Sequence, residues 1–489
     1  MPLTDAVDST GSRGSTGSRS PFFAIFKAYD VRGVVPDQLD TRIVGAIGAG
    51  FARFARTADG ATSIVMGRDM RASGLTLSRA FAAGVLSEGL GVLDAGLVST
   101  DLLYYASGHL GVPGAMLTAS HNPARYNGIK FCLAGAKPVG QDSGLVDIRE
   151  AAEEALARAP VTGEDAAGVE SDARYSTRHL LEDFASHVRS FIDVASLRPM
   201  KVVADTANGM GGLVAPPVFR ELPVDLEILF GELDGTFPNH PADPIQPENL
   251  VALRSRVLEV GADVGLAFDG DADRVFLVDD RAEPLSGSLT TGIVAAAILD
   301  KHPGATILYN LICSKAVPEI VRERGGIPIR TRVGHSFVKA TMAETGAWFG
   351  GEHSGHYYFR DNFRADSGII AALMVLELMS KETAPLSELR KPFERYSDSG
   401  EINRTVRDIG SVLSGFASRY RAEGAAIDEL DGLTIDLGSW WFNLRASNTE
   451  PLLRLNLEAG DAAECAAHVA DVIKLMQALD GVDGTTTGS

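Results

Sequence analysis

The chain has 489 residues, which at about 150 residues per domain corresponds to three or four domains. Hydrophobic residues make up 45% and charged residues 22%, as in ordinary folded proteins, so bulk disorder is excluded. Its 64 acidic and 45 basic side chains give a formal net charge of −19, which disfavours binding to a nucleic-acid backbone.

The first residues are rich in Ser, Gly and Arg and lack the apolar core of a secretory signal, so we expect a disordered tail over residues 1–21. The apolar run Leu285–Leu299 is shorter than the ~20 residues of a membrane helix and is interrupted by Gly, Ser and Thr. Cys132, Cys313 and Cys465 lie too far apart for a disulfide framework or a metal-binding pair. We therefore expect a soluble, cytoplasmic protein that binds no membrane.

From Phe22 onward, apolar runs typical of strands alternate with helical patterns, which predicts βαβ units and an α/β fold. Apolar residues recur at helical spacing over residues 43–51, 77–85 and 180–192. The strand-like runs end near Gly, Asn or Asp clusters, and ligand-binding loops of α/β sheets lie at the carboxyl ends of strands. These runs are Thr62–Met66, Lys201–Ala204, Asp263–Phe268 and Thr306–Tyr309.

Shifts in composition predict the domain boundaries. Residues 150–172 are rich in Ala, Glu, Asp and Gly, which indicates a helix running into a linker, and further breaks are expected after the strand at 275–280 and within 384–400. The last segment combines strand-like runs with a helical pattern and reads as a compact α+β domain. The expected domains are residues 22–172, 173–283, 284–395 and 396–489, the first three of them compatible with diverged copies of one unit.

The strongest local signal is the acidic motif Asp269-Gly-Asp271-Ala-Asp273-Arg274, which follows a strand-like run. Three alternating carboxylates in a turn can converge on one hard cation such as Mg²⁺. An EF-hand would need Gly and Glu where Arg274 and Asp280 stand, so that reading is set aside. A solvated acidic turn is the remaining structural alternative.

A second signal is the segment TASHNP, residues 118–123, followed by YNGIK at residues 126–130. It gathers a hydroxyl from Ser120, an imidazole from His121 and an ammonium group from Lys130 on one loop, which suits a nucleophile with charged neighbours. The nucleophile elbow GxSxG is absent, so a lipase-like site is excluded. From this segment alone, a polar turn is an equally good reading.

Two further loops offer ligand-binding groups. Residues 350–356, GGEHSGH, provide a carboxylate, a hydroxyl and an imidazole suited to sugar hydroxyls, and His335 is a candidate to lie beside them. Residues 445–451, RASNTEP, combine an Arg fork with small polar groups that can cradle a phosphate. Simple surface loops are the alternatives for both. Neither a P-loop nor a complete GxGxxG motif occurs, so nucleotide-binding motifs are missing.

Taken together and in this order, the four motifs closely resemble the α-D-phosphohexomutase family, and within it the phosphomannomutase/phosphoglucomutase group. The segments Phe26–Gly33 and Gly67–Asp69 add to the resemblance, which covers residues 22–480. It implies a heart-shaped protein with a central cleft, built from three similar α/β domains and a C-terminal α+β domain. Each domain would contribute one loop to the cleft.

The resemblance also implies roles for individual residues. Ser120 would be a phosphoserine whose phosphate joins the carboxylates of Asp269, Asp271 and Asp273 around Mg²⁺. Sugar hydroxyls would be held by Glu352, Ser354 and His356, and the phosphate that is not transferred by Arg445, Ser447, Asn448 and Thr449. The reaction centre would be lined by Tyr29, Arg32, His121, Lys130, Arg274 and His335. Lys130 and His356 are the candidates for proton transfer, with His121 as a donor to phosphate.

The implied activity is interconversion of mannose 6-phosphate and mannose 1-phosphate, extending to glucose phosphates, through the phosphoserine and a hexose 1,6-bisphosphate. The implied activator is glucose or mannose 1,6-bisphosphate, and the expected assembly is a monomer or weak homodimer. Phosphoglucosamine mutase, a Mg²⁺-dependent sugar phosphatase and a silent sugar-phosphate sensor are the alternatives. Three positions depart from the family pattern: Ala272 often is Gly, His353 occupies a variable position, and no cation precedes Lys315 after Asn310.

Overall fold

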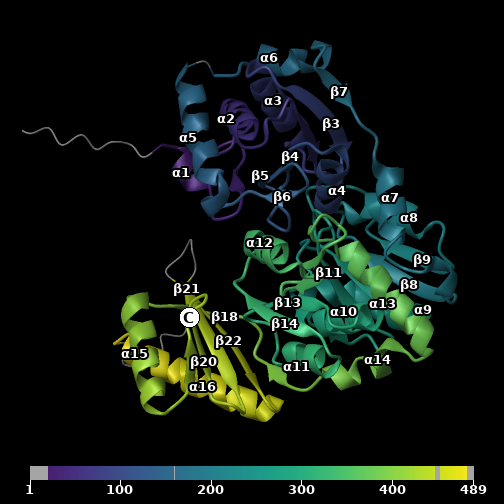
Figure 1. The fold of residues 1–489 in the computed structure, drawn as a ribbon, viewed down its shortest axis with the longest axis vertical. Helices are drawn as coiled ribbons and strands as arrows, with labels where there is room; N and C mark the ends of the chain where they lie inside the picture. Colours follow the sequence, from purple (N-terminus) through teal and green to yellow (C-terminus); the bar gives the residue numbers. More distant parts are fainter. Residues whose placement is uncertain (1–19, 159, 447–451, 482–489) are drawn as a thin grey trace, which may run out of the picture.

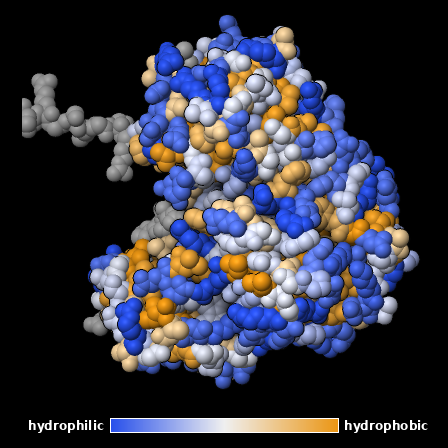
Figure 2. All heavy atoms as spheres, viewed as in Figure 1, coloured by the Kyte–Doolittle hydropathy of each residue, from blue (hydrophilic) through white to orange (hydrophobic). Residues whose placement is uncertain are grey.

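The structure, a computed structural model, describes residues 20–158, 160–446 and 452–481. It consists of four successive units, each built on its own β-sheet and coloured from purple to yellow along the chain (Figure 1). Figure 2 shows the surface hollowed between the first unit and the fourth, which gives the expected heart shape. The predicted architecture of three α/β units and a C-terminal α+β unit is confirmed.

The first unit has a seven-stranded mixed sheet of order β1-β5-β4-β2-β3-β7, with β6 paired to β5. Its strands are β1 (Val31–Val34), β2 (Ser63–Arg68), β3 (Gly91–Leu97), β4 (Gly114–Leu117), β5 (Tyr126–Leu133), β6 (Lys137–Pro138) and β7 (Tyr175–Thr177). Its helices are α1 (Phe22–Ile25), α2 (Thr41–Asp59), α3 (Gly74–Ser87), α4 (Thr100–Leu110), α5 (Leu145–Arg158) and α6 (Gly163–Gly168).

The second unit has five strands in the order β12-β11-β10-β8-β9 and the third has four in the order β14-β13-β15-β16. The second comprises α7 (Leu181–Arg189), β8 (Met200–Asp205), α8 (Gly211–Phe219), β9 (Val224–Leu229), α9 (Val251–Val260), β10 (Val264–Phe268), β11 (Val275–Asp279) and β12 (Pro284–Leu285). The third comprises α10 (Gly287–Lys301), β13 (Thr306–Asn310), α11 (Ala316–Glu323), β14 (Ile327–Thr331), α12 (His335–Thr345), β15 (Phe349–Gly351), β16 (Tyr357–Phe359), α13 (Gly368–Glu382) and α14 (Leu386–Leu389).

The fourth unit is an antiparallel sheet of order β17-β22-β21-β20-β19, with β18 also paired to β22. Its elements are β17 (Ser397–Asp398), β18 (Ile402–Thr405), α15 (Ile409–Ala422), β19 (Ala426–Asp428), β20 (Leu433–Asp436), β21 (Trp441–Ala446), β22 (Leu452–Ala459) and α16 (Ala462–Leu479). Short 3₁₀ turns at Gln141–Ser143, Val169–Ser171, Val194–Ser196, Pro247–Leu250 and Lys391–Phe393 complete the described elements.

The same strand arrangement recurs in the first three units. In each, one strand pairs in parallel with an earlier strand and then, after a loop, in antiparallel with the next: β2-β4-β5, β8-β10-β11 and β13-β15-β16. The loops between the last two strands contain residues 118–125, 269–274 and 352–356. Three of the four predicted motifs therefore occupy equivalent places in three copies of one fold.

Burial follows the alternation of the strands. In β2, Ile64 and Met66 face a core shared with α2 and α3, whereas Val65 faces a second core that continues through the second and third units. The fourth unit has its own core, formed around Phe416, Phe442 and its strands. The first three units thus share a continuous apolar interior, and the fourth is attached to them without one.

The sheets place the boundaries slightly differently from the composition of the sequence. The boundary expected at residue 172 falls before β7, which pairs with β3 and therefore belongs to the first sheet. The boundary expected at residue 283 falls before β12, which pairs with β11 in the second sheet. We propose that the first two domains extend through these strands, because a strand is stabilised by the sheet that it joins. The expected tail lies, except for its last two residues, outside the part of the chain that is described.

Within the described residues, no helix is long and apolar enough to cross a membrane.

Helices α2 and α3 pack backbone against backbone, which provides a test of the first domain. A Cβ on Gly84 would lie 2.0 Å from the carbonyl oxygen of Gly45, and one on Gly48 would lie 2.3 Å from that of Phe81. Gly84→Ala should lower the free energy of unfolding by about 1–3 kcal/mol, although Ala is the better helix former, because the helices must separate. The measurement is thermal unfolding followed by circular dichroism. Gly163→Ala, which has open space around it, is the matched control; equal stability of the two variants would contradict the packing.

Candidate active site

The loop after β4 holds Ser120 in an uncommon conformation. Its φ is 50°, a region that non-glycine residues rarely adopt, and strained backbone of this kind gathers at functional sites. The Ser120 amide donates to the hydroxyl of Thr118 at 2.9 Å. Arg71 fastens the loop from below, since its guanidinium donates to the carbonyl oxygens of Ser120 and Asn122 at 2.7 Å each. The result is a buried serine on a rigid turn.

Arg32 on β1 supports the same loop from the other side. Its guanidinium donates to the carbonyl oxygen of Ala119 at 3.3 Å and to the side-chain oxygen of Asn122. It is also paired with Asp30 at 2.8 Å. Although burial favours the neutral form, Asp30 raises the pKa of Arg32, so its charge is retained beside the serine.

The acidic loop after β10 lies directly against this serine. A Cβ on Gly270 would stand 2.5 Å from the carbonyl oxygen of Ser120, so only glycine permits the approach. Ala272 has a φ of 60°, which turns the chain between the alternating carboxylates. The Ser120 hydroxyl donates to Asp269 Oδ2 at 2.8 Å, and Arg274 Nη2 donates to Ser120 Oγ at 3.2 Å. Residues some 150 positions apart therefore meet at one hydroxyl.

The three aspartates form a cluster suited to a metal ion. One carboxylate oxygen of each of Asp269, Asp271 and Asp273 lies within 4.8 Å of the others, and all three side chains are buried. Asp271 Oδ1 and Asp273 Oδ1 have no hydrogen-bond partner among the described residues, which is costly for buried oxygens. The residues present therefore fit a hard divalent cation with oxygen ligands.

Charge balance supports the same conclusion. Lys130 Nζ contacts Asp271 Oδ2 at 2.8 Å and Asp273 Oδ2 at 2.6 Å, and Arg274 pairs with Asp269 at 2.7 Å. Although burial favours the neutral amine, the two aspartates raise the pKa of Lys130 well above its usual value. Three carboxylates against two cations leave one negative charge, and a phosphate on Ser120 would add nearly two more. A divalent cation would offset most of that excess.

The sugar-type loop after β15 is joined to the acidic loop by a backbone bridge between Arg274 and His356. His356 Nδ1 lies at hydrogen-bond distance, 2.9 Å, from the Ser354 hydroxyl oxygen. His356 Nε2 lies 3.8 Å from Asp273 Oδ1. Glu352 is almost fully buried, and its carboxylate receives hydrogen bonds from Asn310, from the Gly334 amide and from Tyr358. The structure thus brings the acidic motif and the predicted sugar-binding motif into contact.

The predicted histidines differ in surroundings. Burial, Arg274 and Arg32 lower the pKa of His121 well below its usual value, so a neutral imidazole faces Ser120 at 3.3 Å. His335 begins α12, and burial together with Lys339 lowers its pKa to about 3. Its Nδ1 is buried without a hydrogen-bond partner within the described parts of the chain. In contrast, His353 Nδ1 contacts the Ser288 hydroxyl at 2.9 Å.

The fourth predicted motif is only partly described. Arg445, the last but one residue of β21, lies next to two carboxylates, with Asp431 at 3.7 Å and Glu401 at 3.9 Å. Ser447, Asn448 and Thr449 lie outside the described residues. Lys315, the cation nearest to Ile312 in sequence, pairs with Asp436 at 2.6 Å, so it faces the fourth domain.

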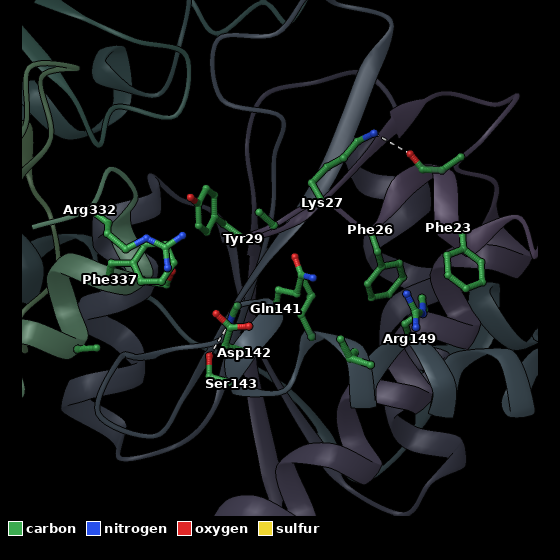
Figure 3. A pocket seen from close by; sticks show the side chains of 17 residues that line it. Phe23, Phe26, Lys27, Tyr29, Gln141, Asp142, Ser143, Arg149, Arg332 and Phe337 are labelled. Carbon is green, nitrogen blue, oxygen red and sulfur yellow. Dashed lines mark hydrogen bonds between the residues drawn. The ribbon is translucent and has the colours of Figure 1, made fainter. Parts of the chain in front are cut away.

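A cavity of about 930 Å³ opens beside Tyr29, between the first domain and α12 (Figure 3). Tyr29, Arg332 and Phe337 lie on one side of it and Phe23, Phe26 and Arg149 on the other. Neither Ser120 nor the three aspartates of the acidic loop line it. The cavity therefore adjoins the cluster of loops and does not enclose the reacting groups.

Sequence reasoning missed several side chains that hold this site together. Arg71 is buried and fastens four carbonyl groups of the serine loop, of Ser120, Asn122, Pro123 and Tyr126. Thr100 donates to Asp271 Oδ2 at 2.5 Å from the start of α4. Their sequence neighbourhoods carry no motif, and only the nearby Gly67–Asp69 segment pointed to this region. Such roles become visible only when the partners are in place.

All four units match a known family. Residues 24–159, 182–283 and 286–396 match the alpha/beta/alpha domains I, II and III of phosphoglucomutase/phosphomannomutase, and residues 386–475 match its C-terminal domain. Four such units around one loop cluster define an isomerase of the α-D-phosphohexomutase class, whose members depend on a metal ion. The chain belongs to the phosphoglucomutase/phosphomannomutase family.

Individual relatives agree over nearly the whole chain. A protein named phosphohexose mutases from Xanthomonas campestris is 38% identical over 455 residues, which cover 92% of this chain and 99% of the relative. A phosphomannomutase of Escherichia coli is 37% identical over 459 residues, covering 92% and 98%. The crystal structure of a family protein from Burkholderia thailandensis has a TM-score of 0.85 and 30% identity, covering 95% and 99%.

Asp101, next to Thr100, gives a prediction of pH dependence. Burial raises its pKa from an ordinary 3.8 to about 7, despite hydrogen bonds from Ser99 and Ser367. Because the folded pKa exceeds the unfolded one, the ionised carboxyl destabilises the fold, increasingly as pH rises from about 4 to about 7. Asp101→Asn removes this penalty. The stability of the variant relative to the wild type should therefore rise by on the order of 2–3 kcal/mol between pH 5 and pH 8.

Urea unfolding of both proteins at the two pH values measures this difference. A constant offset between them would mean that Asp101 titrates normally.

Proposed function

We propose that this protein is a phosphomannomutase that interconverts mannose 6-phosphate and mannose 1-phosphate and also accepts glucose phosphates. The observation that supports it most directly is the Ser120 hydroxyl, held between Asp269 and Arg274 from another domain. The relatives named phosphomannomutase cover almost the full chain, which supports mannose as the sugar.

The proposed cycle consists of two phosphoryl transfers. Phospho-Ser120 gives its phosphoryl group to the free hydroxyl of a hexose monophosphate. The bond from phosphorus to Ser120 Oγ breaks and one to the sugar oxygen forms, while the sugar hydroxyl loses a proton and Ser120 Oγ gains one. The product is a hexose 1,6-bisphosphate. After the bisphosphate turns around, Ser120 Oγ loses its proton and attacks the other phosphate. The bond from that phosphorus to the sugar oxygen breaks, and the sugar oxygen takes up a proton. Phosphate is neither gained nor lost overall.

The residues around Ser120 match what this chemistry needs, which is positioning and charge neutralisation more than covalent bonding. Arg274 and Lys130 place positive charge next to the transferred group, with Arg32 behind the loop. We propose that His121 donates to phosphate oxygens. Lys130 and His356 are the proposed carriers of the hydroxyl proton.

We assign the metal site to Asp269, Asp271, Asp273 and the phosphate of Ser120, with Mg²⁺ as the ion. When bound, Mg²⁺ would neutralise charge on the transferred phosphoryl group. Glu352, Ser354 and His356 are proposed to hold sugar hydroxyls, with Tyr29 and His335 beside them, and Arg445, Ser447, Asn448 and Thr449 to bind the phosphate that stays. Glucose or mannose 1,6-bisphosphate would phosphorylate Ser120 and so activate a monomer or weak homodimer.

Phosphorus NMR tests the reaction. With Mg²⁺ and a trace of glucose 1,6-bisphosphate, mannose 1-phosphate should convert to mannose 6-phosphate, and glucose and glucosamine 1-phosphates should convert more slowly. Ser120→Ala should lower the rate at least ~1,000-fold because the covalent carrier is lost, with an unchanged circular dichroism spectrum. Release of inorganic phosphate alone would identify a phosphatase. Fastest turnover of glucosamine 1-phosphate would identify a phosphoglucosamine mutase.

Metal dependence is tested separately by binding. Calorimetry without substrate should detect one Mg²⁺ per chain in the wild type and at least ~10-fold weaker binding in Asp273→Asn, because one charged ligand is lost. Chelation should abolish turnover, and added Mg²⁺ should restore it. Asp234→Asn, on the surface of the same domain, is the control and should bind as the wild type does. Equal affinity in Asp273→Asn would remove this residue from the ligand set.

A further inference from the structure

One short segment between β14 and α12 contacts three parts of the protein. The carbonyl oxygen of Val333 accepts a hydrogen bond from the Tyr29 hydroxyl of the first domain at 3.1 Å. The Val333 amide donates to Asp431 Oδ2 of the fourth domain at 3.1 Å. The next amide, of Gly334, donates to Glu352 Oε1 in the sugar loop at 3.0 Å. Consecutive backbone groups therefore join all three.

The backbone of this segment is packed closely against its neighbours. Gly334 has a φ of 123°, which residues with a side chain rarely adopt, and a Cβ there would meet the Tyr29 ring at 2.7 Å. Immediately before it, β14 is paired with β13 as far as Thr331. Because Val333 and Gly334 are adjacent, a displacement of Val333 by one partner would also shift the groups that contact the other two.

On the side of the fourth domain, Asp431 lies between this segment and Arg445. Its Oδ2 is 3.1 Å from the Val333 amide nitrogen and 3.7 Å from Arg445 Nη1. Its own backbone is fixed, because Asn443 Nδ2 donates to the Asp431 carbonyl oxygen at 3.1 Å. Burial and the nearby Asp431 carboxylate raise the pKa of Tyr29. Movement of Arg445 on binding a phosphate would act on Asp431 first.

On the side of the third domain, the Gly334 amide is one of three donors that orient Glu352. Asn310 Nδ2 donates to Oε1 at 3.2 Å and the Tyr358 hydroxyl to Oε2 at 2.6 Å. Because the carboxylate is buried, losing one donor would turn it or leave an oxygen unsatisfied. The direction in which Glu352 faces a sugar therefore depends on where Gly334 stands.

The polar contacts carry special weight here because the fourth domain has its own apolar core, separate from the interior shared by the other three. Its orientation is set by contacts such as Asp431 to Val333, Lys315 to Asp436 and Arg330 to Asp428. The last two are ion pairs between side chains. The Asp431 contact differs, since it engages the backbone that also holds Glu352.

We propose that Asp431 is a positioning residue that couples the phosphate-binding Arg445 to the sugar-binding Glu352 through the backbone of Val333 and Gly334. Occupation of the phosphate loop would then adjust the carboxylate that recognises the hexose, so that a ligand carrying both groups binds better than its parts would. This inference rests on the proposed function, because it takes a hexose phosphate as the ligand.

A double-mutant cycle tests the coupling. In a Ser120→Ala background, which prevents turnover, calorimetry measures binding of mannose 1-phosphate to Glu352→Gln, Asp431→Ala and the double variant. Independent sites contribute multiplicatively, whereas coupled sites do not. Each single change should weaken binding. The double variant should bind at least ~5-fold more tightly than expected if the two single losses of affinity simply multiplied.

Two controls separate coupling from a general loosening of the fourth domain. Asp428→Ala breaks an ion pair to Arg330 at the same boundary, and its effect should multiply with that of Glu352→Gln. Asp431→Asn keeps an oxygen for the Val333 amide and loses the charge facing Arg445. It should therefore weaken binding but leave Glu352 oriented, so that its effect multiplies with that of Glu352→Gln. If Asp431 had a purely structural role, Asp431→Ala and Asp428→Ala would combine with Glu352→Gln in the same way.

The outcomes are distinct. Multiplicative effects of Asp431→Ala and Glu352→Gln would overturn the coupling while leaving the proposed function intact. Equal non-additivity at Asp428 would overturn the specific role of Asp431. If the Ser120→Ala protein binds no hexose phosphate at all, the proposed function itself fails.

Discussion

The site depends on the close approach of the acidic loop to Ser120, across the boundary between the first and second domains. Gly270 makes this approach possible, because a side chain there would collide with the serine backbone. Once the loops meet, Asp269 and Arg274 reach the hydroxyl, and Lys130 reaches the other two carboxylates. Every other part of the proposed chemistry is arranged around this contact.

Repetition explains how the chain assembles the site. Three α/β domains place their functional loops after the same strand of the same sheet pattern, so packing the copies around one centre brings the loops together. The continuous apolar core of these domains holds the serine loop, the acidic loop and the sugar loop in place relative to one another. The fourth domain has a core of its own, so contacts such as that of Asp431 with the Val333 amide help to set its orientation.

Much of the site could be predicted because its motifs are local. Ser120, the three aspartates and the glycine-rich sugar loop each follow a strand within a few residues, and alternating carboxylates after a strand favour a metal site. The supporting residues could not be predicted. Arg71 and Tyr358 donate hydrogen bonds to the serine loop and the sugar loop, respectively. The sequence around one arginine or tyrosine does not indicate which residue it will contact.

The sequence alone determined the class of the fold, the order of its units and the chemical groups available, because these depend on periodicity and on residue type. Only the tertiary structure decided where the sheets end, as β7 and β12 show by pairing back to earlier strands. It also decided that His353 faces Ser288 and that Lys315 faces the fourth domain, whereas Asp431 joins the backbone beside Glu352. Such contacts are set by the packing of whole domains, which no short stretch of sequence encodes.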